Sequence, residues 1–346
     1  MPKNKNLYAV ILAGGSGTRF WPMSKESKPK QYLNIIGKDT LFQKTLKRIS
    51  ARVDINNIFI VTSIAHKNIL KQQMSQIKVP KSNILYEPAV RNTAPAILWA
   101  SAKINKINPN ATIAIFPSDH LITEQKKFFS VLDKAVELAS DDYLVTFGIV
   151  PTRPETGFGY LKTKKVKLGK KNILKVEKFT EKPSVQKAKR FVRNSKYFWN
   201  SGMFVWKSSV ILKAFNIYMP GLYRKMVKNT NQSQINKIYK SLTSVSIDYG
   251  ILEKSDNVAA IKARNIGWSD LGSWESLMEV LSRNKDGNYL KGNIIPLKCR
   301  NTLVIGDKKL IAAVGLENIV IVDTPEALLI CQKHMSQQVR DIVSRI

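Results

Sequence analysis

Short apolar runs alternate with amphipathic segments through the first 150 residues. Continuous apolar runs, which are typical of strands buried on both faces of a parallel sheet, occupy residues 7–12, 58–61, 112–116 and 143–150. Helical spacing of apolar positions occurs at residues 41–49, from 65 onward, at 94–107 and at 128–139. This alternation predicts an α/β fold with a doubly wound, mixed but mostly parallel sheet, in which ligands bind beyond the carboxyl ends of the strands.

The pattern changes near residue 285. Four short apolar runs follow, at residues 302–305, 310–314, 319–322 and 328–331, and helical spacing closes the chain at 335–346. Regularly spaced short strands are typical of a small all-β unit. We therefore expect a larger domain over residues 1–285 and a small β-rich domain over 286–346, for which a left-handed β-helix is one form, ending in a helix. The second domain is also a candidate surface for homodimer formation.

Composition places the chain among globular proteins. Hydrophobic residues make up 44% of the 346 residues, which is enough for a sizeable core. No uncharged apolar run of about 18 residues occurs, so we expect no membrane span. The apolar stretch from Leu7 to Ala13 leads directly into a glycine loop, unlike a signal peptide. Two isolated cysteines, Cys299 and Cys331, indicate a reducing compartment. We expect a cytoplasmic protein.

The chain is strongly basic, with 56 Lys and Arg against 25 Asp and Glu and a net charge of +31. Such a balance can indicate nucleic-acid binding. The excess is mostly Lys and is spread over the whole chain, which favours compositional drift on solvated faces over a dedicated nucleic-acid surface. A basic protein would still attract phosphorylated substrates.

A glycine-rich loop follows the first apolar run, in the sequence LAGGSGTRFWP. Glycines let backbone N–H groups curve around an anion without interfering side chains. The loop lacks the GxxxxGK[ST] pattern, and Phe20 stands where a dinucleotide-binding loop has its third glycine. It therefore predicts another kind of phosphate site. The candidate nucleotide-binding residues are Leu12, Ala13, Gly14, Gly15, Ser16, Gly17 and Thr18.

Basic residues follow the loop closely. Arg19 offers a permanently charged fork that suits phosphate oxygens, and SKPKQYL adds Lys28 and Lys30. Pro22 and Pro29 restrain the segment between them. A tight turn with solvated basic residues is the alternative interpretation. The full string GGSGTR…KPKQ favours a rigid loop that carries these cations toward one phosphate group.

These motifs resemble the N-terminal signature of the sugar-nucleotide pyrophosphorylases. FWP followed by PKQYL is closest to the GDP-mannose pyrophosphorylase branch, the mannose-1-phosphate guanylyltransferases, and the resemblance covers almost the whole chain. It implies that GTP and mannose 1-phosphate react with the help of Mg²⁺ to give GDP-mannose and pyrophosphate. Some members of this family carry an additional C-terminal isomerase domain. Because this chain ends at Ile346, we expect a single activity.

The resemblance also assigns roles to two acidic motifs. It implies that EPAVRNTAPAI lies against the nucleotide base, with Glu87 as a candidate reader of guanine and Arg91, Asn92 and Thr93 as polar contacts. A structural role for Glu87 before Pro88, and helix capping by Asn92 or Thr93, are equally open. In FPSDH, Asp119 ends an apolar strand and on its own would be a cap or turn residue. The resemblance implies that Asp119 and Asp270, of GWSDLGSW, bind Mg²⁺ together.

Three further motifs point to the sugar. In PTRPETGFGYL, Gly157 and Gly159 would permit close backbone approach to a ligand. The resemblance implies that Glu181 of FTEKP binds sugar hydroxyls and that Lys182 binds the sugar phosphate, and WNSGMFVW offers Asn200 to the sugar. Asp248 of SIDYGILEK either supports this site or pairs with a lysine.

The chemistry implied is an in-line transfer without a general base, because the attacking phosphate is already an anion. The protein must then supply position and positive charge, and we take Arg19, Lys30, Asp119 and Asp270 as the catalytic set. No His or Cys spacing typical of a metal site occurs, and no GxSxG motif occurs. The alternatives are a pyrophosphorylase for another nucleotide or for heptose or glucose 1-phosphate, a regulator that kept the fold and lost catalysis, and a nucleic-acid binder.

Overall fold

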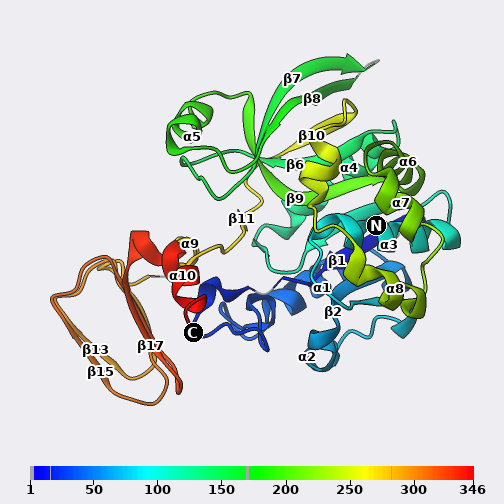
Figure 1. Ribbon diagram of the computed structural model, residues 1–346. Helices are drawn as coiled ribbons and strands as arrows, with labels where there is room; N and C mark the ends of the chain where they lie inside the picture. The colour runs from blue at the N-terminus through cyan, green and yellow to red at the C-terminus, as the bar shows by residue number, and fades with distance from the viewer. Residues whose placement is uncertain (1–3, 16, 169–170, 282) are drawn as a thin grey trace. The chain divides into compact units, whose positions relative to one another are not determined.

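The computed structural model describes residues 4–15, 17–168, 171–281 and 283–346. The chain forms two compact units, each assembled from separate segments (Figure 1). Unit 1 comprises residues 1–14, 46–118 and 122–268, and unit 2 comprises residues 15–45, 119–121 and 269–346. The sequence predicts two continuous domains with one boundary at residue 285, whereas each of these units combines three separate segments of the chain.

Unit 1 is built on a large sheet. Within the described residues the sheet has nine strands: β1 (Leu7–Leu12), β2 (Ile58–Ser63), β3 (Ile84–Glu87), β4 (Thr112–Pro117), β6 (Leu144–Ile149), β7 (Tyr160–Leu168), β8 (Lys171–Thr180), β9 (Tyr197–Lys207) and β10 (Val258–Ala263). Its helices are α2 (Lys67–Gln73), α3 (Thr93–Ile107), α4 (Gln125–Ala139), α5 (Val185–Val192), α6 (Ser208–Tyr218), α7 (Pro220–Met226) and α8 (Gln232–Ile238). Helix α1 (Leu41–Ser50) and the short strands β5 (Leu121–Ile122) and β11 (Trp268–Ser269) complete this part of the chain.

The sheet is mixed, in the order β3-β2-β1-β4-β9-β6-β10-β8-β7. Strands β3, β2, β1 and β4 pair in parallel, as do β6 and β10. Strand β9 lies between β4 and β6 and is antiparallel to both, and β7 and β8 also pair antiparallel. The expectation of a mixed sheet is confirmed, but its mostly parallel character holds only in part, for β3 to β4 and for β6 with β10. A continuous apolar run predicts burial, but it does not predict the direction of the neighbouring strand.

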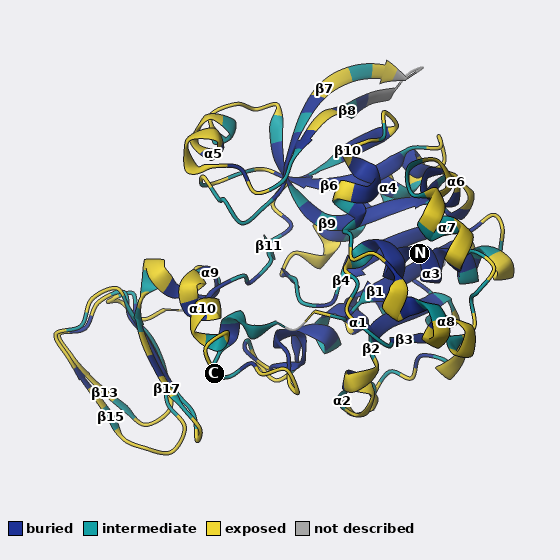
Figure 2. Cartoon of the chain, viewed as in Figure 1, coloured by how far each residue is buried: buried dark blue, intermediate teal, exposed yellow. Residues whose placement is uncertain are grey.

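Helices cover both faces of this sheet. Ile113 and Ile115 of β4 belong to the core shared with α3 and α6, whereas Phe116 contacts Phe128 of α4 at 5.9 Å between ring centroids. Successive residues of a strand point to opposite faces, so α4 lies across the sheet from α3 and α6. Figure 2 shows the consequence, since the central strands are buried and the outer helices carry the exposed residues. Within the described residues, no helix is long and apolar enough to cross a membrane.

Unit 2 ends in a β-rich stretch in which the chain alternates between two small sheets. Its strands are β12 (Tyr289–Lys291), β13 (Ile294–Leu297), β14 (Leu303–Ile305), β15 (Ile311–Val314), β16 (Ile319–Asp323) and β17 (Leu328–Gln332), and its α-helices are α9 (Trp274–Met278) and α10 (Val339–Val343). One sheet has the order β12-β14-β16-β17, and the other pairs β13 with β15. All these pairs are parallel except β16–β17. The helix predicted at 335–346 is shorter, because residues 333–338 form a 3₁₀ turn before α10.

The core of unit 2 connects its N-terminal loop to this β-rich stretch. Phe20 packs edge-on against Trp274 of α9, with 4.8 Å between ring centroids, and the Trp274 indole N–H donates to the Trp21 carbonyl at 3.3 Å. Leu303 and Val320, from β14 and β16, belong to the same cluster. Burial of two large aromatic rings thus fixes the segment that follows the glycine loop.

Candidate functional site

Unit 2 contains a pocket of about 320 Å³ at the glycine loop. It is lined by residues from three segments of the chain: Gly15, Gly17, Thr18, Arg19, Lys30, Asp119, His120, Asp270, Leu271 and Gly272. The structure therefore brings together all four predicted catalytic residues and three of the predicted loop residues. Ser16 lies outside the described residues. His120 was not singled out by its motif, although it directly follows Asp119 in the sequence.

The glycine loop is held tightly against Lys30. Gly17 has a φ of 56°, and a β-carbon at this position would lie 2.5 Å from the Lys30 backbone nitrogen. Only glycine fits such a left-handed, crowded position. The Gln31 side-chain amide donates to the Gly15 carbonyl at 2.9 Å, so the loop is anchored on both sides of residue 16. This arrangement is the rigid loop that the sequence predicted.

The Lys30 ammonium is buried and fully satisfied by oxygen atoms. Its Nζ lies 2.8 Å from Asp119 Oδ2 and donates to the carbonyl oxygens of Asp270 at 2.5 Å and Leu271 at 3.0 Å. The side chain is only 7% exposed. An ammonium group has three donors, and all three are used here. Lys30 thus connects the segments that carry the two predicted metal-binding carboxylates.

The two carboxylates have different surroundings. Burial tends to raise the pKa of Asp119, but the adjacent Lys30 ammonium and His120 outweigh it and hold that pKa below its usual range. Asp119 is therefore ionised at neutral pH. Asp270 Oδ1 accepts a hydrogen bond from the Gly272 backbone N–H at 3.2 Å. Both side chains line the same pocket, and hard carboxylate oxygens are the ligands that Mg²⁺ prefers.

The described part of the chain contains no group of three or more His, Cys, Asp or Glu side chains arranged to hold a metal ion. Mg²⁺ commonly uses one or two carboxylates and completes its shell with substrate phosphates and water. The pair of Asp119 and Asp270 beside a phosphate-type loop fits that mode of binding.

The predicted base-reading residue lies at the carboxyl end of β3, in unit 1. A β-carbon on Gly14 would lie 2.6 Å from Glu87 Oε2. The Glu87 carboxyl group therefore lies directly against the backbone at Gly14, in the loop that follows β1. The Tyr239 hydroxyl donates to Glu87 Oε1 at 2.5 Å. Burial raises the pKa of Glu87 to about 7, although the Tyr239 hydrogen bond opposes the shift. Its contacts within the protein are those of a structural residue, and the contact with a base stays a prediction.

Arg91, Asn92 and Thr93 fix the start of α3. Asn92 caps the helix, its Oδ1 accepting the Thr93 N–H at 2.8 Å, which confirms one of the two capping alternatives. Thr93 Oγ1 accepts the Ile247 N–H at 2.9 Å. The Arg91 guanidinium donates to the carbonyl of Lys240. The Arg91 and Thr93 side chains thus connect the loop after β3 to residues 240–247.

The predicted sugar-binding residues lie together in unit 1. A β-carbon on Gly159 would lie 2.6 Å from Glu181 Oε2, and the Asn200 backbone N–H donates to the Gly159 carbonyl at 2.8 Å. Lys182 Nζ lies 3.7 Å from Glu181 Oε1. The Asn200 side-chain amide donates to Asp248 Oδ1 at 2.8 Å, so Asp248 joins this group rather than pairing with a lysine.

Further contacts involve residues near this group. The Gly157 N–H donates to Glu155 Oε1 at 3.0 Å. Burial and the nearby Glu181 raise the pKa of Asp248 to about 7. Thr146, which contacts Asn200, was missed, because a buried threonine in an apolar strand carries no distinguishing signal.

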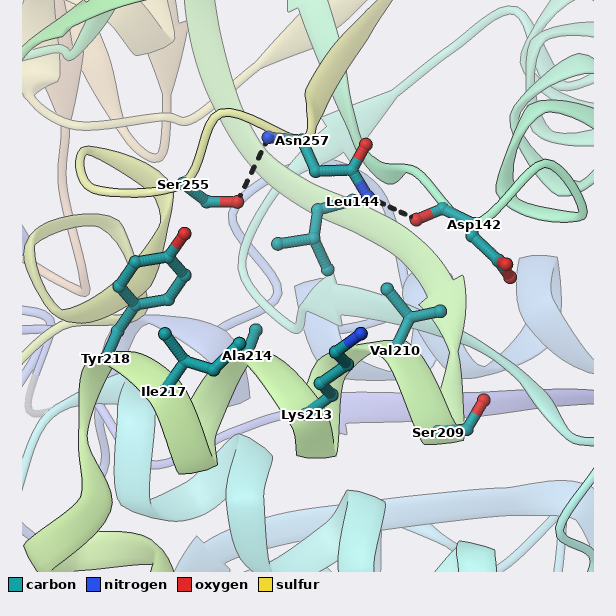
Figure 3. A pocket seen from close by; sticks show the side chains of 10 residues that line it. All are labelled: Asp142, Leu144, Ser209, Val210, Lys213, Ala214, Ile217, Tyr218, Ser255 and Asn257. Carbon is teal, nitrogen blue, oxygen red and sulfur yellow. Dashed lines mark hydrogen bonds between the residues drawn. The ribbon is translucent and has the colours of Figure 1, made fainter.

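A different hollow of about 380 Å³ in unit 1 contains none of the predicted residues (Figure 3). Residues of α6 form one side, including Val210 and Lys213, and Leu144 at the start of β6 forms another. In Figure 3, the Asn257 side chain donates to the Asp142 carbonyl, at 2.6 Å. Ligands of α/β sheets bind beyond the carboxyl ends of strands. This hollow lies at an amino end, and we do not assign it to the reaction.

Comparison with known proteins supports the phosphate-site interpretation. A family model described as nucleotidyl transferase matches residues 8–287, which is more than half of the chain. The chain belongs to the nucleotidyl transferase family. A second model, described as the MannoseP isomerase/GMP-like beta-helix domain, matches residues 292–346 of this nucleotidyl transferase.

Named relatives match this nucleotidyl transferase over nearly its whole length. The xanthan biosynthesis protein XanB of Xanthomonas campestris is 38% identical over 345 residues, covering 97% of this chain and 72% of that protein. A mannose-1-phosphate guanylyltransferase of Escherichia coli is 33% identical, covering 98% of this chain and 75% of that protein. A crystal structure described as mannose-1-phosphate geranyltransferase from Thermus thermophilus is 28% identical, with a TM-score of 0.88, covering 98% of this chain and 99% of that one.

Proposed function

We propose that this chain transfers the GMP moiety of GTP to mannose 1-phosphate, giving GDP-mannose and pyrophosphate. The pocket that joins Arg19, Lys30, Asp119 and Asp270 at the glycine loop carries this proposal. The name of the E. coli relative, mannose-1-phosphate guanylyltransferase, supports the choice of substrates.

In the proposed reaction, a phosphate oxygen of mannose 1-phosphate forms a bond to the α-phosphorus of GTP. The bond from that phosphorus to the oxygen bridging the β-phosphate breaks, and the electron pair leaves with pyrophosphate. The attacking oxygen is already anionic, so no side chain has to remove a proton. The protein acts by positioning two polyanions and by offsetting their charge.

Arg19 is the cation of the pocket that we assign to the phosphates. Lys30 acts differently, because its three donors are occupied by Asp119, Asp270 and Leu271. It holds the Asp119 carboxylate and the backbone at Asp270 in place, and it adds fixed positive charge beside the loop. Asp119 and Asp270 would hold Mg²⁺, which when bound supplies positive charge to the triphosphate and the leaving pyrophosphate.

We assign the remaining predicted residues to the two substrates. The backbone of the loop would contact the nucleotide phosphates, at Leu12, Ala13, Gly14, Gly15, Ser16, Gly17 and Thr18. Glu87, Arg91, Asn92 and Thr93 would lie near the base. Gly157, Gly159, Glu181, Lys182 and Asn200 would bind mannose 1-phosphate. The contacts among Gly159, Glu181 and Asn200 support the assignment of this last group to mannose 1-phosphate.

A second proposal concerns the organisation of the chain. We propose a catalytic domain over 1–285 and a β-rich domain over 286–346 that mediates homodimer formation. Exposed apolar side chains on β13, β15 and β17, namely Ile295, Leu297, Val314, Leu328 and Ile330, support self-association. Free cysteines at positions 299 and 331 support a cytoplasmic location. We propose no nucleic-acid partner, since the lysines are dispersed along the chain.

A pyrophosphate-release screen tests the proposed function. GTP, ATP, UTP and dTTP would each be combined with mannose, glucose and heptose 1-phosphates, in the presence of Mg²⁺. We expect the highest kcat/KM with GTP and mannose 1-phosphate. A higher value for another pair would reassign the substrates, and no turnover with any pair would favour a non-catalytic regulator.

Substitution of Arg19 tests the assignment of the pocket. Arg19→Ala should lower kcat by roughly 10²–10³, the usual effect of removing one preorganised charge-stabilising donor. Arg345→Ala, which removes the same side chain from an exposed position of unit 2, serves as the matched control. Equal activity of the two purified variants would exclude Arg19 from the chemistry.

A further inference from the structure

Strand β9 is irregular where it passes β6. Thr146 pairs with Phe204 and Gly148 pairs with Asn200, so three residues of β9 lie opposite a single residue of β6. Gly202, within this bulge, has a φ of 69°, a left-handed conformation that favours glycine. Bulges beside binding sites re-aim a side chain. The side chain affected here is that of Asn200.

Asn200 is held at three points. Its backbone N–H donates to the Gly159 carbonyl at 2.8 Å. Its side-chain oxygen accepts from the Thr146 hydroxyl at 2.9 Å, and its side-chain nitrogen donates to Asp248 Oδ1 at 2.8 Å. Thr146 is fully buried, so its hydroxyl is shielded from competing water.

These contacts determine which way the amide faces. The Gly202 backbone N–H also approaches the Asn200 side-chain oxygen, at 3.5 Å, and a backbone N–H can only donate. An amide has two acceptor sites on its oxygen and two N–H donors. Thr146 and Gly202 use the oxygen and Asp248 uses one N–H. What Asn200 can still offer to a ligand is the second N–H.

A single amide donor beside carboxylates suits the hydroxyl groups of a sugar. A hydroxyl can accept from the Asn200 N–H and donate its own proton to a carboxylate oxygen of Asp248 or Glu181. If the amide turned over, its oxygen would face Asp248, and two acceptors would oppose each other. Removal of the Thr146 hydroxyl would leave the amide oxygen only the longer contact with the Gly202 N–H, at 3.5 Å, so the orientation would be held less firmly.

We propose that Thr146 is a positioning residue for the sugar phosphate: together with the β9 bulge, it orients the Asn200 amide so that an N–H faces a sugar hydroxyl. This inference rests on the proposed function for the identity of that sugar. Thr146 itself does not touch the substrate. Its effect should therefore appear in binding of one substrate and should disappear when Asn200 is removed.

The test compares Thr146→Val, which keeps the shape and loses the hydroxyl, with Thr146→Ser, which keeps the hydroxyl. Thr146→Val should raise the KM for mannose 1-phosphate by roughly five- to tenfold, the usual effect of losing one hydrogen bond. The KM for GTP and kcat should stay close to the wild-type values. Thr146→Ser should resemble the wild type in all three constants.

A double-mutant cycle separates positioning from a general packing effect. In an Asn200→Ala background, Thr146→Val should cause no further rise in the KM for mannose 1-phosphate. Additive effects in this background would overturn the proposal. So would equal effects of Thr146→Val and Thr146→Ser, or an equal rise in the KM for GTP.

Failure of the proposed function is recognised separately, from the wild-type protein. If the wild type uses a different sugar 1-phosphate, the same variants are compared with that substrate. If it turns over no pair, side-chain amides are observed in protein labelled with ¹⁵N-asparagine, and the Asn200 signal is identified by its loss in Asn200→Ala. Mannose 1-phosphate should shift that signal in the wild type and in Thr146→Ser but not in Thr146→Val. The absence of any shift in the wild type would overturn the inference.

Discussion

Desolvation acts on Asp119 in unit 2 and on Glu87 and Asp248 in unit 1, yet their pKa values move in opposite directions. Asp119 lies 2.8 Å from a buried ammonium, and its pKa is lowered. Glu87 and Asp248 receive hydrogen bonds from a hydroxyl and an amide, and burial raises both pKa values to about 7.

The difference shows that a neutral donor does not offset the cost of removing a carboxylate from water, whereas a full charge does. Unit 2 therefore presents a charged carboxylate suited to a cation such as Mg²⁺. Unit 1 presents carboxyl groups near the balance between charged and neutral forms, which suits hydrogen bonding to uncharged groups such as hydroxyls and a base.

Removal of the ammonium should have the largest effect. Lys30→Met keeps the length of the side chain and leaves Asp119 without its ion-pair partner. We expect kcat to fall by roughly 10²–10³, as determined by pyrophosphate release. Lys38→Met, at an exposed position of unit 2, is the control. If Lys30→Met kept its activity, the ion pair that distinguishes Asp119 from the carboxyls of unit 1 would have no role in catalysis.

Neutralising Glu87 should change how stability depends on pH. Because its folded pKa of about 7 lies above the ordinary value of 4.5, the folded state holds a proton that the unfolded state loses between these values. Its contribution to stability is complete below the lower pKa and is lost as pH rises through the upper one, by roughly 3 kcal/mol. Glu87→Gln should therefore reduce the loss of stability between pH 4.5 and 7.

Urea unfolding at a series of pH values provides the measurement. Asp248 contributes with the same sign in a similar range, so the difference between wild type and Glu87→Gln is the relevant quantity. Glu317→Gln changes an exposed carboxyl of unit 2 and should leave the pH dependence unchanged. Parallel wild-type and Glu87→Gln curves would refute the assignment.

A smaller effect is expected at the second carboxylate of unit 2. Asp270→Asn keeps the shape of the side chain and removes its charge, so the Mg²⁺ concentration for half-maximal activity should rise by about tenfold. The Mg²⁺ titration of Asp248→Asn, at a carboxyl of unit 1, should be unaltered. An unaltered titration for Asp270→Asn would remove this residue from the metal site.

The smallest effect concerns the neutral donor of unit 1. Tyr239→Phe removes the hydroxyl that bonds Glu87 and should cost about 1 kcal/mol of unfolding free energy. Because that hydrogen bond lowers the pKa of Glu87, its loss should move the pKa further upward. The pH dependence described for Glu87 should then extend to higher pH. A shift toward lower pH would contradict the role assigned to the hydroxyl.

Much of the pocket in unit 2 could be predicted from the sequence. Its loop is continuous in the chain, and the restraints on Gly17 and Lys30 are local consequences of glycine and proline. Strands β1, β2 and β4 and helices α1, α2 and α3 were also predicted, because their apolar periods are unbroken. Strand β3 was missed, and the antiparallel direction of β9 was not predicted, because an apolar run predicts burial but not strand direction. Strands β12 and β13 were missed as well, since none of their side chains is fully buried.

The remaining features depend on contacts between distant residues. Tyr239 and Glu87 are 152 positions apart, and neither motif carries a sign of the other. Thr146 is a buried threonine in an otherwise apolar strand, and its role appears only when the β9 bulge places Asn200 beside it. The family resemblance indicated which residues matter, but not that Lys30 would be satisfied by three protein oxygens.

The crowding at Gly17 has a consequence for how this loop can diverge. A β-carbon at Gly15 would meet no atom within 4 Å, whereas one at Gly17 would collide with the Lys30 backbone. The fold therefore restricts substitution at Gly17 much more than at Gly15, although both belong to one motif. Evolutionary drift or library-based engineering has room to explore position 15, limited only by the ligand, while position 17 permits no replacement unless the neighbouring segment moves with it.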